Sequence, residues 1–182
     1  MCDQPGTIHW PEKERLQGSV FCPSLPERIP DIVRHHEVPF NTIRTNVEEL
    51  RGSGFGTHPR YECFVAEVSP DQKSKEGYTL VGSVLSSYTY NCWRGKNLYM
   101  DNLYVMPEFR GKGIGQLLME RATQVAWHRG CTELQMCISS TKGGKEKFLA
   151  WRNAEDLTLK EGWNLFQIDT NVLWRMAAQS KF

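Results

Sequence analysis

Hydrophobic residues concentrate in three consecutive segments in the middle of the chain, each bounded by turn-forming residues. Residues Tyr61 to Val68, Leu80 to Tyr90 and Leu98 to Met106 are rich in β-branched or aromatic side chains, which favour strands. Turn-forming residues separate these segments at Ser69-Pro70-Asp71 and at Arg94-Gly95-Lys96-Asn97. Because short connections join the segments in order, the pattern predicts an antiparallel meander.

A helical period begins after residue 113. Apolar residues recur every three or four positions from Ile114 to Ala126, and Gly130 ends the run, which predicts an amphipathic helix. Residues Glu133 to Ser139 alternate between polar and apolar and predict another strand, followed by a helix from Lys145 to Arg152. Strands mixed with helices in this order predict an α/β fold.

Weaker patterns predict four further elements. They are a helix from Ser24 to Arg34, a helix from Thr45 to Arg51 that stops at glycines 52, 54 and 56, a strand from Trp163 to Ile168, and a short helix around Leu173 to Ala177. Residues 1–18 show no sustained period and are expected to form a poorly ordered tail. One domain is therefore expected from residue 19 to residue 182.

Composition restricts the class of protein and its partners. The chain of 182 residues is 40% hydrophobic and 24% charged, as in globular proteins. Its net charge of +1 provides no overall field for nucleic acid or for an anionic membrane, so neither is expected as a partner. No apolar stretch approaches the ~20 residues that cross a bilayer. The start of the chain lacks a basic-then-apolar signal, so a cytoplasmic location is expected.

The six cysteines do not form a metal-binding pattern. They lack both Cys-x-x-Cys and the paired Cys/His spacing of tetrahedral zinc sites. The adjacent histidines His35 and His36 have no third ligand nearby in the sequence. Reduced, buried thiols are therefore expected, and no metal is expected.

The loop Arg110-Gly111-Lys112-Gly113-Ile114-Gly115, called the glycine loop below, connects a predicted strand directly to a predicted helix. Three alternate glycines let the main chain approach a ligand without side-chain obstruction. The first N–H groups of a helix have no acceptor within it, and the helix dipole makes that end positive. The loop is therefore predicted to bind a pyrophosphate. A plain strand-to-helix turn is the alternative interpretation.

Two other glycine-rich phosphate motifs do not match. A dinucleotide fingerprint needs glycine at the position of Gln116, and a P-loop needs a Gly-Lys-Ser or Gly-Lys-Thr triplet that the chain lacks. The glycine loop instead resembles the coenzyme A loop of the GCN5-related N-acetyltransferases. In that pattern Arg or Gln is followed by two residues, Gly, one residue, and Gly or Ala, which here are Arg110, Gly113 and Gly115.

From about Val20 to Ala177 the chain resembles the diamine acetyltransferases that act on spermidine and spermine. The residues that carry this likeness are Gly54-Phe55-Gly56, His58-Pro59, Tyr61, Cys63, Val65-Ala66-Glu67-Val68, Tyr90, Trp93, Gly95-Lys96, Tyr99, Val105-Met106 and Glu161-Gly162-Trp163. The resemblance implies a mixed, mostly antiparallel central sheet flanked by helices, with a splayed strand pair that forms the cleft for acetyl-coenzyme A. It also implies a homodimer.

The same resemblance implies a set of residues for the co-substrate acetyl-coenzyme A. Main-chain groups of the first strand of the pair would hold the pantetheine arm, the glycine loop would hold the pyrophosphate, and residues of the next strand would face the arm. These residues are Leu103, Tyr104, Val105, Arg110, Gly111, Lys112, Gly113, Ile114, Gly115, Gln116, Gln135, Met136 and Cys137. Met136 and Cys137 are equally well explained as sheet core.

The amine site implied by the resemblance consists of Asn91, Asp101, Asn102, Glu161 and Trp163. A protein with little net charge can select a polyamine only by placing carboxylates and aromatic faces along a groove. Relatives mostly carry acids at the first three positions, whereas this chain has one aspartate and two amides. A diamine, a monoamine or a lysine-like compound such as thialysine is therefore as plausible as spermine. Asp101 as a solvated strand residue is the alternative.

The implied reaction is direct acetyl transfer to an unprotonated amine. Water held on Asp101 would remove the amine proton, and the amide N–H of Val105 or a neighbour would polarise the carbonyl. Relatives use a tyrosine to protonate the departing sulfur, but Leu149 stands at that position here. Lys142 replaces an asparagine that is usual beside the cofactor, and Asn153 replaces a glycine. Slow catalysis is expected.

Two alternatives to an active enzyme remain from the sequence. A catalytically weak or inactive relative that binds coenzyme A as a regulatory protein is favoured by Leu149 and by the two amides. A structural or interaction protein with an unused glycine loop is disfavoured, because the pattern from Arg110 to Gly115 is intact.

Overall fold

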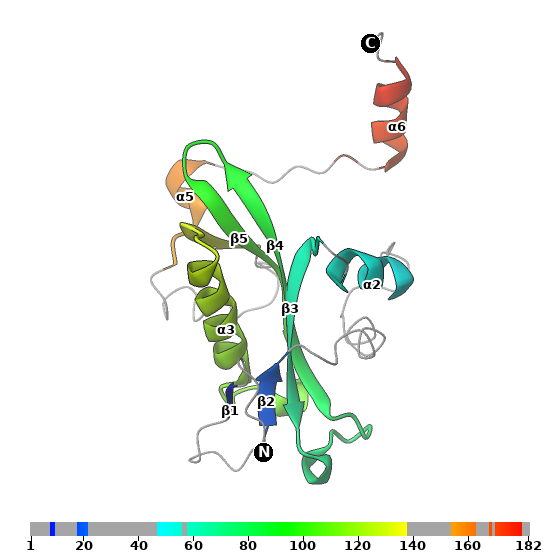
Figure 1. Ribbon diagram of the computed structural model, residues 1–182, viewed down its shortest axis with the longest axis vertical. Helices are drawn as coiled ribbons and strands as arrows, with labels where there is room; N and C mark the ends of the chain where they lie inside the picture. Colours follow the sequence, from blue (N-terminus) through cyan, green and yellow to red (C-terminus); the bar gives the residue numbers. More distant parts are fainter. Residues whose placement is uncertain are drawn as a thin grey trace. The chain divides into compact units, whose positions relative to one another are not determined.

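The computed structural model describes residues 8–9, 18–21, 47–55, 58–137, 154–162, 168 and 170–179. By its internal contacts the chain divides into two units, Met1–Cys137 and Ile138–Phe182. The first unit contains the sheet and the glycine loop (Figure 1). The expected boundary between a tail and a domain at residue 18 stays a prediction, because most of residues 1–17 lie outside the described ranges.

A single mixed sheet organises the first unit. Its strands are β1 (Ile8–His9), β2 (Gly18–Phe21), β3 (Tyr61–Val68), β4 (Leu80–Asn91), β5 (Gly95–Val105) and β6 (Glu133–Met136). They lie side by side in chain order, and every neighbouring pair is antiparallel except the parallel pair β5–β6. The predicted meander is confirmed as β3–β4–β5. The turn expected from Arg94 to Asn97 is wrong from its second residue onward, because β5 already begins at Gly95.

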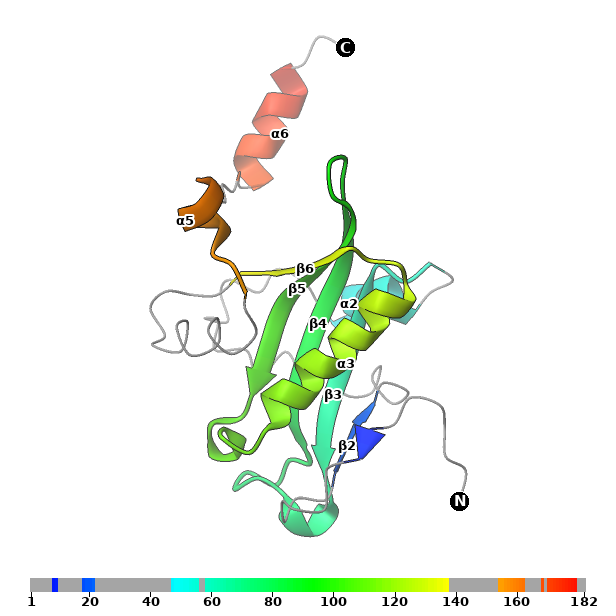
Figure 2. The same ribbon diagram turned by 90° about the vertical axis from the view of Figure 1, so that its left-hand side faces the viewer.

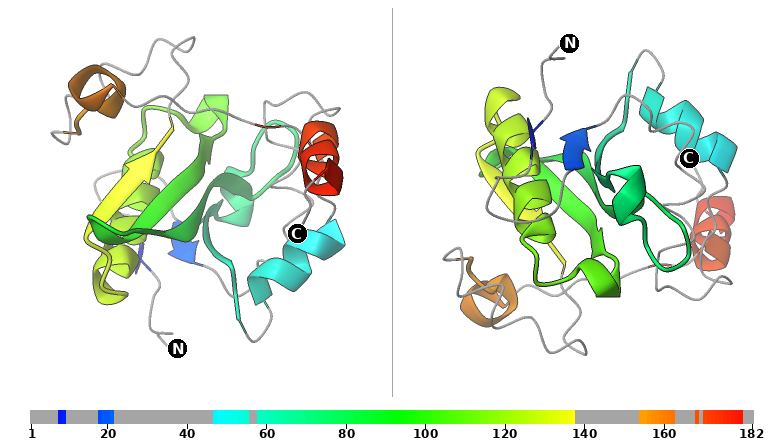
Figure 3. Two further views of the ribbon diagram at one scale, coloured as in Figure 1. Left: turned by 90° about the horizontal axis from the view of Figure 1, so that it is seen from above. Right: turned by 90° about the horizontal axis from the view of Figure 1, so that it is seen from below.

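Two helices of the first unit cover opposite faces of the sheet. Helix α3 (Ile114–His128) lies on one face and α2 (Val47–Phe55) on the other (Figures 2 and 3). The buried residues of α3 follow the predicted helical period and are Ile114, Leu118, Met119, Ala122 and Ala126. Burial of this apolar stripe stabilises the helix against the sheet, as the sequence predicted.

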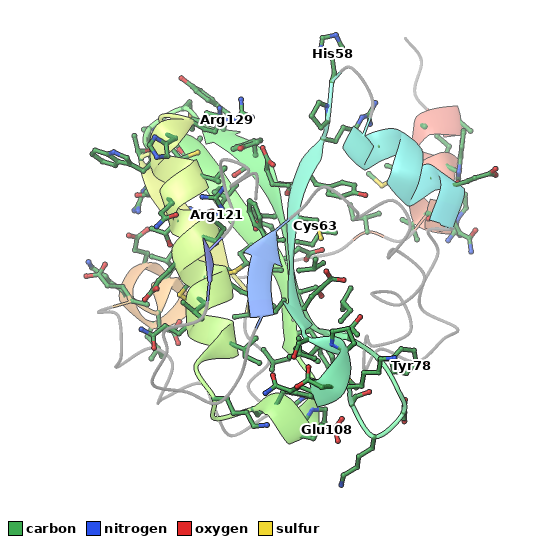
Figure 4. The ribbon with its side chains drawn as sticks, turned by 60° about the horizontal axis from the view of Figure 1, so that its bottom comes forward. His58, Cys63, Tyr78, Glu108, Arg121 and Arg129 are labelled. Carbon is green, nitrogen blue, oxygen red and sulfur yellow. The ribbon has the colours of Figure 1, made fainter. Side chains whose placement is uncertain are left out.

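Each face of the sheet has its own apolar cluster. On the α3 side, Leu98 of β5 packs with Ala122 and Ala126. On the other side, Cys63 of β3 packs with Val65 and Leu80. Figure 4 shows Cys63 projecting from β3 away from α3, which carries Arg121. Successive strand residues point to opposite faces, so a residue's position in the register identifies its face.

One extra residue interrupts the alternation of β5. Leu85 of β4 pairs with Asn102, but the next residue, Ser86, pairs with Met100, so Asp101 has no partner on β4. This β-bulge shifts the alternation by one position. Leu98 and Met100 face α3 before the bulge, and Leu103 and Val105 take that face after it. The bulge therefore lets even-numbered residues before it and odd-numbered residues after it pack into the same core.

Helix α2 continues through two glycines at which the sequence predicted that it would stop. A Cβ at Gly54 would collide with the ring of Tyr61 on the adjacent strand β3. Gly54 therefore permits close helix–strand contact, and the prediction that it ends the helix was wrong. The predicted helices from Ser24 to Arg34 and from Lys145 to Arg152 lie outside the described residues.

The second unit contains two described helices, α5 (Leu157–Glu161) and α6 (Thr170–Gln179). Asp156 caps α5 by accepting hydrogen bonds at Oδ1 from the N–H groups of Thr158 at 3.0 Å and Leu159 at 3.4 Å. Helix α6 contains the predicted segment Leu173 to Ala177. The predicted strand from Trp163 lies outside the described residues except for its last position.

Candidate acetyl-coenzyme A site

The glycine loop is anchored to the end of β5. The guanidinium of Arg110 donates a hydrogen bond from Nε to the carbonyl oxygen of Val105 at 2.8 Å. Between these residues, the 3-10 helix η3 (Pro107–Phe109) buries Phe109, and the N–H of Met106 donates to the carbonyl oxygen of Val81 at 2.9 Å. These contacts fix the position at which α3 begins.

Two of the loop glycines are required by their backbone conformation. Gly111 has φ of +78° and Gly113 has φ of +83°, in the left-handed region that side chains with a Cβ rarely adopt. Gly115 lies within α3, where an added Cβ would meet Val105 Cγ2 at 3.7 Å, an ordinary contact. Glycine is therefore required at the first two positions by the left-handed turn, whereas the space at position 115 would also admit a Cβ.

The N-terminus of α3 has free hydrogen-bond donors. Its N-cap residue, Gly113, has no side chain to accept from the helix, and the first turn contains no acidic residue. Among the described residues, no acceptor is present for the N–H groups of residues 111–116. Converging amide donors at the positive end of a helix of 15 residues fit the oxygens of a phosphate group. The geometry fits the pyrophosphate that the sequence predicted.

Two cationic side chains flank these amides. Arg110 is exposed, and its Cζ lies 5.9 Å from the centroid of the Tyr104 ring. Lys112 is half-buried, and its Nζ lies 4.5 Å from the centroid of the Phe109 ring. Aromatic faces hold both cations near the loop. The site therefore combines fixed amide dipoles with two positive charges, which suits a polyanionic ligand.

Leu103, Tyr104 and Val105, the residues expected to contact the pantetheine arm, are the last three of β5. From Val105 back to Asp101 the strand extends for about 14 Å, at ~3.4 Å per residue. The described pairing of β5 with β6 ends at Met100 and Met136. Divergence of the two strands beyond this point depends on residues after Cys137, outside the described ranges, so the splayed cleft stays a prediction.

Asp101 is exposed at the bulge of β5, close to Tyr99 and Cys137. Hydrogen bonding with Cys137, then burial and the charges of Cys137 and Asp101, raise the pKa of Tyr99 to about 12. The sequence analysis did not assign Tyr99 to the site. Its position two residues before Asp101 on a strand was the available signal, since such residues share a face.

The three expected residues of the second strand divide between the faces of the sheet. Gln135 lies directly across from Tyr99, and Met136 lies across from the buried Met100 on the α3 side. Cys137 follows β6 and is exposed. The side chains of Gln135 and Cys137 can therefore contact a ligand that lies beside Tyr99. Met136 points to the opposite face, toward α3.

The residues expected to bind the amine are not all brought together. Asn91 ends β4 opposite Gly95, and its Oδ1 accepts the N–H of Trp93 at 2.9 Å. Gly95 precedes Asp101 by six positions on β5, or about 20 Å. Asn91 therefore stabilises a hairpin turn far from Asp101 in the same chain, while Asn102 lies next to the bulge, across from Leu85.

The remaining candidates belong to the second unit. Glu161 is the last residue of α5 and is exposed. Trp163, Leu149, Lys142 and Asn153 lie outside the described residues. In the ranges that the structure describes, no group of three His, Cys, Asp or Glu side chains could hold a metal ion, and no helix is long and apolar enough to span a membrane.

Comparison with known proteins identifies the family of the chain. The model of the acetyltransferase (GNAT) family matches residues 33–143, which include β5, the glycine loop and α3. A thialysine N-epsilon-acetyltransferase from Mus musculus is 31% identical over 137 residues, covering 75% of this chain and 81% of the relative. A spermidine/spermine N(1)-acetyltransferase-like protein 1 from Homo sapiens is 30% identical over 156 residues, covering 86% of this chain and 22% of the relative.

Solved structures share the fold. An integron cassette protein from the mobile metagenome of V. cholerae superimposes with a TM-score of 0.62 at 19% identity, covering 90% of this chain and 98% of that one. The aminoglycoside N-acetyltransferase AAC(6')-Iy, solved in complex with coenzyme A, superimposes with a TM-score of 0.61 at 14% identity, covering 88% and 99%. With its matching family model, close relatives and fold, the chain belongs to the acetyltransferase (GNAT) family.

Proposed function

We propose that the protein transfers the acetyl group of acetyl-coenzyme A directly to the amino group of a small amine, such as a diamine or a thialysine-like compound. The observation that carries this proposal is the N-terminus of α3, where the amides of residues 111–116 have no described acceptor. Relatives named as thialysine N-epsilon-acetyltransferases and as a spermidine/spermine acetyltransferase-like protein support the substrate class.

Coenzyme A is held in two places in this proposal. Its pyrophosphate accepts hydrogen bonds from the glycine loop amides, with the charges of Arg110 and Lys112 nearby. Main-chain groups from Leu103 to Val105 hold the pantetheine arm by adding to the strand edge. This course leads toward the bulge at Asp101, so the binding groups direct the thioester to the acidic residue of β5.

The chain's own groups then supply two functions. An alkylammonium ion has a pKa near 10.4, so a proton must be removed before the nitrogen can attack. The exposed Asp101 carboxylate holds the water that removes it. The amide N–H of Val105 or a neighbour donates to the carbonyl oxygen as negative charge develops there. Acetyl-coenzyme A supplies an acetyl group on a thioester, and no covalent enzyme intermediate is needed.

The charge of the site favours a short or lysine-like amine over a long polyamine. Asp101 is the one acid among the three β4 and β5 positions, since Asn91 and Asn102 are amides. Along a single chain, Asn91 also lies about 20 Å from Asp101, so these positions do not form a continuous acidic groove. One ammonium group beside one carboxylate requires no such groove.

The test is acetyl transfer to a panel of amines. Purified protein is given acetyl-coenzyme A with thialysine, lysine, putrescine, spermidine or spermine, and the acetylated amine is measured by mass spectrometry. We expect product with thialysine or a diamine. Turnover of no amine, with coenzyme A still bound in calorimetry, would contradict the proposal.

That contrary outcome would establish the second candidate function, a coenzyme A-binding protein without useful catalysis. The residue that favours it is Leu149, which offers no proton donor at the position where relatives carry tyrosine. Absence of both binding and turnover would reject both functions. The homodimer expected from the resemblance is testable on the same sample by light scattering.

A further inference from the structure

Three reactive side chains from two strands gather where the pairing of β5 and β6 ends. Tyr99 of β5 lies across from Gln135 of β6. Cys137 comes two residues after Gln135 and Asp101 two residues after Tyr99, so the register places both beside Tyr99 on the same face. The charges of both groups act on the Tyr99 hydroxyl. A phenol, a thiol and a carboxylate therefore meet on the face of the sheet opposite α3.

This cluster lies where the proposed reaction needs a proton donor. The glycine loop is at the C-terminal end of β5, and Asp101 is about 14 Å back along the strand. Asp101 is the base of the proposed reaction, so the acetyl group and its sulfur must come close to it. Both Asp101 and Cys137 are exposed, and a bound substrate can reach them.

We propose that the Cys137 thiol protonates the departing thiolate, with Tyr99 as the residue that positions the thiol. The proposal rests on the proposed acetyl transfer and supplies the donor that Leu149 does not provide. It assigns a role to a residue that resemblance alone places beside the cofactor arm.

The proton and electron balance closes without another reactant. The amine nitrogen forms a bond to the carbonyl carbon, the carbon–sulfur bond breaks, and its electron pair leaves with the sulfur. That sulfur takes the proton of the Cys137 thiol. The cysteine thiolate accepts a hydrogen bond from the Tyr99 hydroxyl. The proton that the ammonium loses before the attack passes through the water at Asp101 to solvent. The second proton, lost from the nitrogen after the attack, passes through the same water to the cysteine thiolate, so one proton is released overall. The products are an amide and free coenzyme A.

The chemical match favours a thiol in this role. Donor and acceptor are both alkyl thiols, so the proton passes between groups of the same chemical type. Tyr99 keeps its own proton at neutral pH because its pKa is about 12, and so remains a hydrogen-bond donor. On β5 and β6, the other charged groups described on this face are Asp101 and Glu133, whose Oε1 lies 3.1 Å from Nη1 of Arg94. Helix α2, on the same face, carries Glu48 and Glu49, and the phenol of Tyr61, on β3, is two strands away.

Selective alkylation tests the location of Cys137 without measuring activity. Wild-type protein is treated with iodoacetamide, with and without saturating coenzyme A, and each cysteine peptide is quantified by mass spectrometry. Cys92 is the internal control, because it is also exposed but lies in the β4–β5 turn. We expect coenzyme A to slow alkylation of Cys137 at least about 10-fold and to leave Cys92 unchanged. Equal protection of both, or of neither, would overturn the placement.

Kinetics of matched variants tests the chemistry. We expect Cys137→Ser to lower kcat by about 10-fold to 100-fold with both KM values nearly unchanged, because a hydroxyl of similar size is a much weaker acid. Cys92→Ser should match wild type. The fall of kcat at alkaline pH that deprotonation of the thiol causes should be absent from Cys137→Ser. In Tyr99→Phe, kcat should still fall at alkaline pH, but the fall should occur at a different pH than in wild type.

The outcomes separate this inference from the function on which it rests. If wild type acetylates amines and Cys137→Ser keeps its rate and pH profile, the thiol is not the donor and the proposed function stands. A wild type without turnover contradicts both. If Cys137→Ser loses affinity for coenzyme A instead of rate, the residue belongs to the binding surface and the proton donor is another group.

Discussion

Arg110 donates from Nε to the carbonyl oxygen of Val105 over 2.8 Å, which joins the first residue of the glycine loop to the last residue of β5. The strand end and the helix start are thereby held together by one side chain. A ligand bound to the loop amides is therefore aligned with the strand. In the proposed function, this alignment connects phosphate binding at one end of the site to the chemistry about 14 Å away at Asp101.

Replacing Gly113 with Asp should abolish coenzyme A binding. The substitution adds a Cβ at φ of +83° and a negative charge at the N-terminus of α3. Calorimetry should show at least about 100-fold weaker binding, which corresponds to ~2.7 kcal/mol. The control is Gly77→Asp, with a similar φ of +86° in the turn before β4 and open space for a Cβ. Equal affinity in the two variants would contradict the loop assignment.

Asp101→Asn should lower kcat by about 100-fold, because an amide cannot accept the amine proton. Affinity for coenzyme A should stay unchanged, since the phosphate donors lie elsewhere. Asp71→Asn is the matched control, at an exposed carboxylate in the 3-10 helix η2 (Pro70–Gln72). Steady-state kinetics with a saturating amine measures the effect. Full activity in Asp101→Asn would mean that the residue is only a solvated strand position.

Glu161→Gln should raise the KM for the amine and leave that for acetyl-coenzyme A nearly unchanged. A carboxylate–ammonium hydrogen bond is roughly twice as strong as one between neutral groups, so its loss weakens the amine selectively. Glu155→Gln is the control in the same unit, where Glu155 Oε2 accepts from Lys160 Nζ at 2.6 Å. Weaker binding of the cofactor instead of the amine would place the amine site elsewhere.

Leu149→Tyr should raise kcat by about 10-fold and leave the amine KM nearly unchanged, as expected for a group that acts in the transition state. The gain should be larger in a Cys137→Ser background, where no thiol donates. Comparison of kcat for the two single variants, the double variant and wild type measures this coupling. No gain in either background would mean that position 149 does not face the sulfur.

Tyr88→Phe should make stability less dependent on alkaline pH. The Tyr88 hydroxyl donates to Glu62 Oε1 at 3.0 Å, and burial followed by the Glu62 charge raises its pKa to about 12. In the unfolded chain this pKa is near 10, so the stabilisation is complete below about pH 10 and is lost as pH rises toward 12. Urea denaturation at about pH 9 and about pH 11 should show a smaller decrease in unfolding free energy in Tyr88→Phe than in wild type.

Local patterns were sufficient for the central sheet and its main helix. Strand β3 has the predicted bounds, Tyr61 to Val68, and α3 begins at the predicted Ile114. Both signals are local, because β3 is a run of strand-forming residues bounded by turn formers and α3 repeats an apolar period. The role of Gly54 could not be predicted from local sequence. This glycine permits close contact between α2 and Tyr61 of β3, and contacts between separate elements leave no local pattern.

The site was predictable in part for the same reason. The glycine loop is a continuous segment whose glycines at 111 and 113 have the required left-handed conformation. The neighbourhood of Tyr99 and Cys137 depends on the register between β5 and β6, which residue order does not specify. Helix α5 was not predicted, because its five residues are too few to show a helical period, although Asp156 and Gly162 mark its two ends.

The unpaired position of Asp101 in the sheet has a consequence for how this protein can change. Residue 101 has no cross-strand partner on β4, so a different side chain there would leave the neighbouring pairs Leu85–Asn102 and Ser86–Met100 intact. A change of this side chain therefore has little effect on folding. In the proposed function, the position of the catalytic base is thus separate from the pairs that hold the strand in the sheet, so an inactive descendant that keeps the fold and the glycine loop can arise by a single substitution.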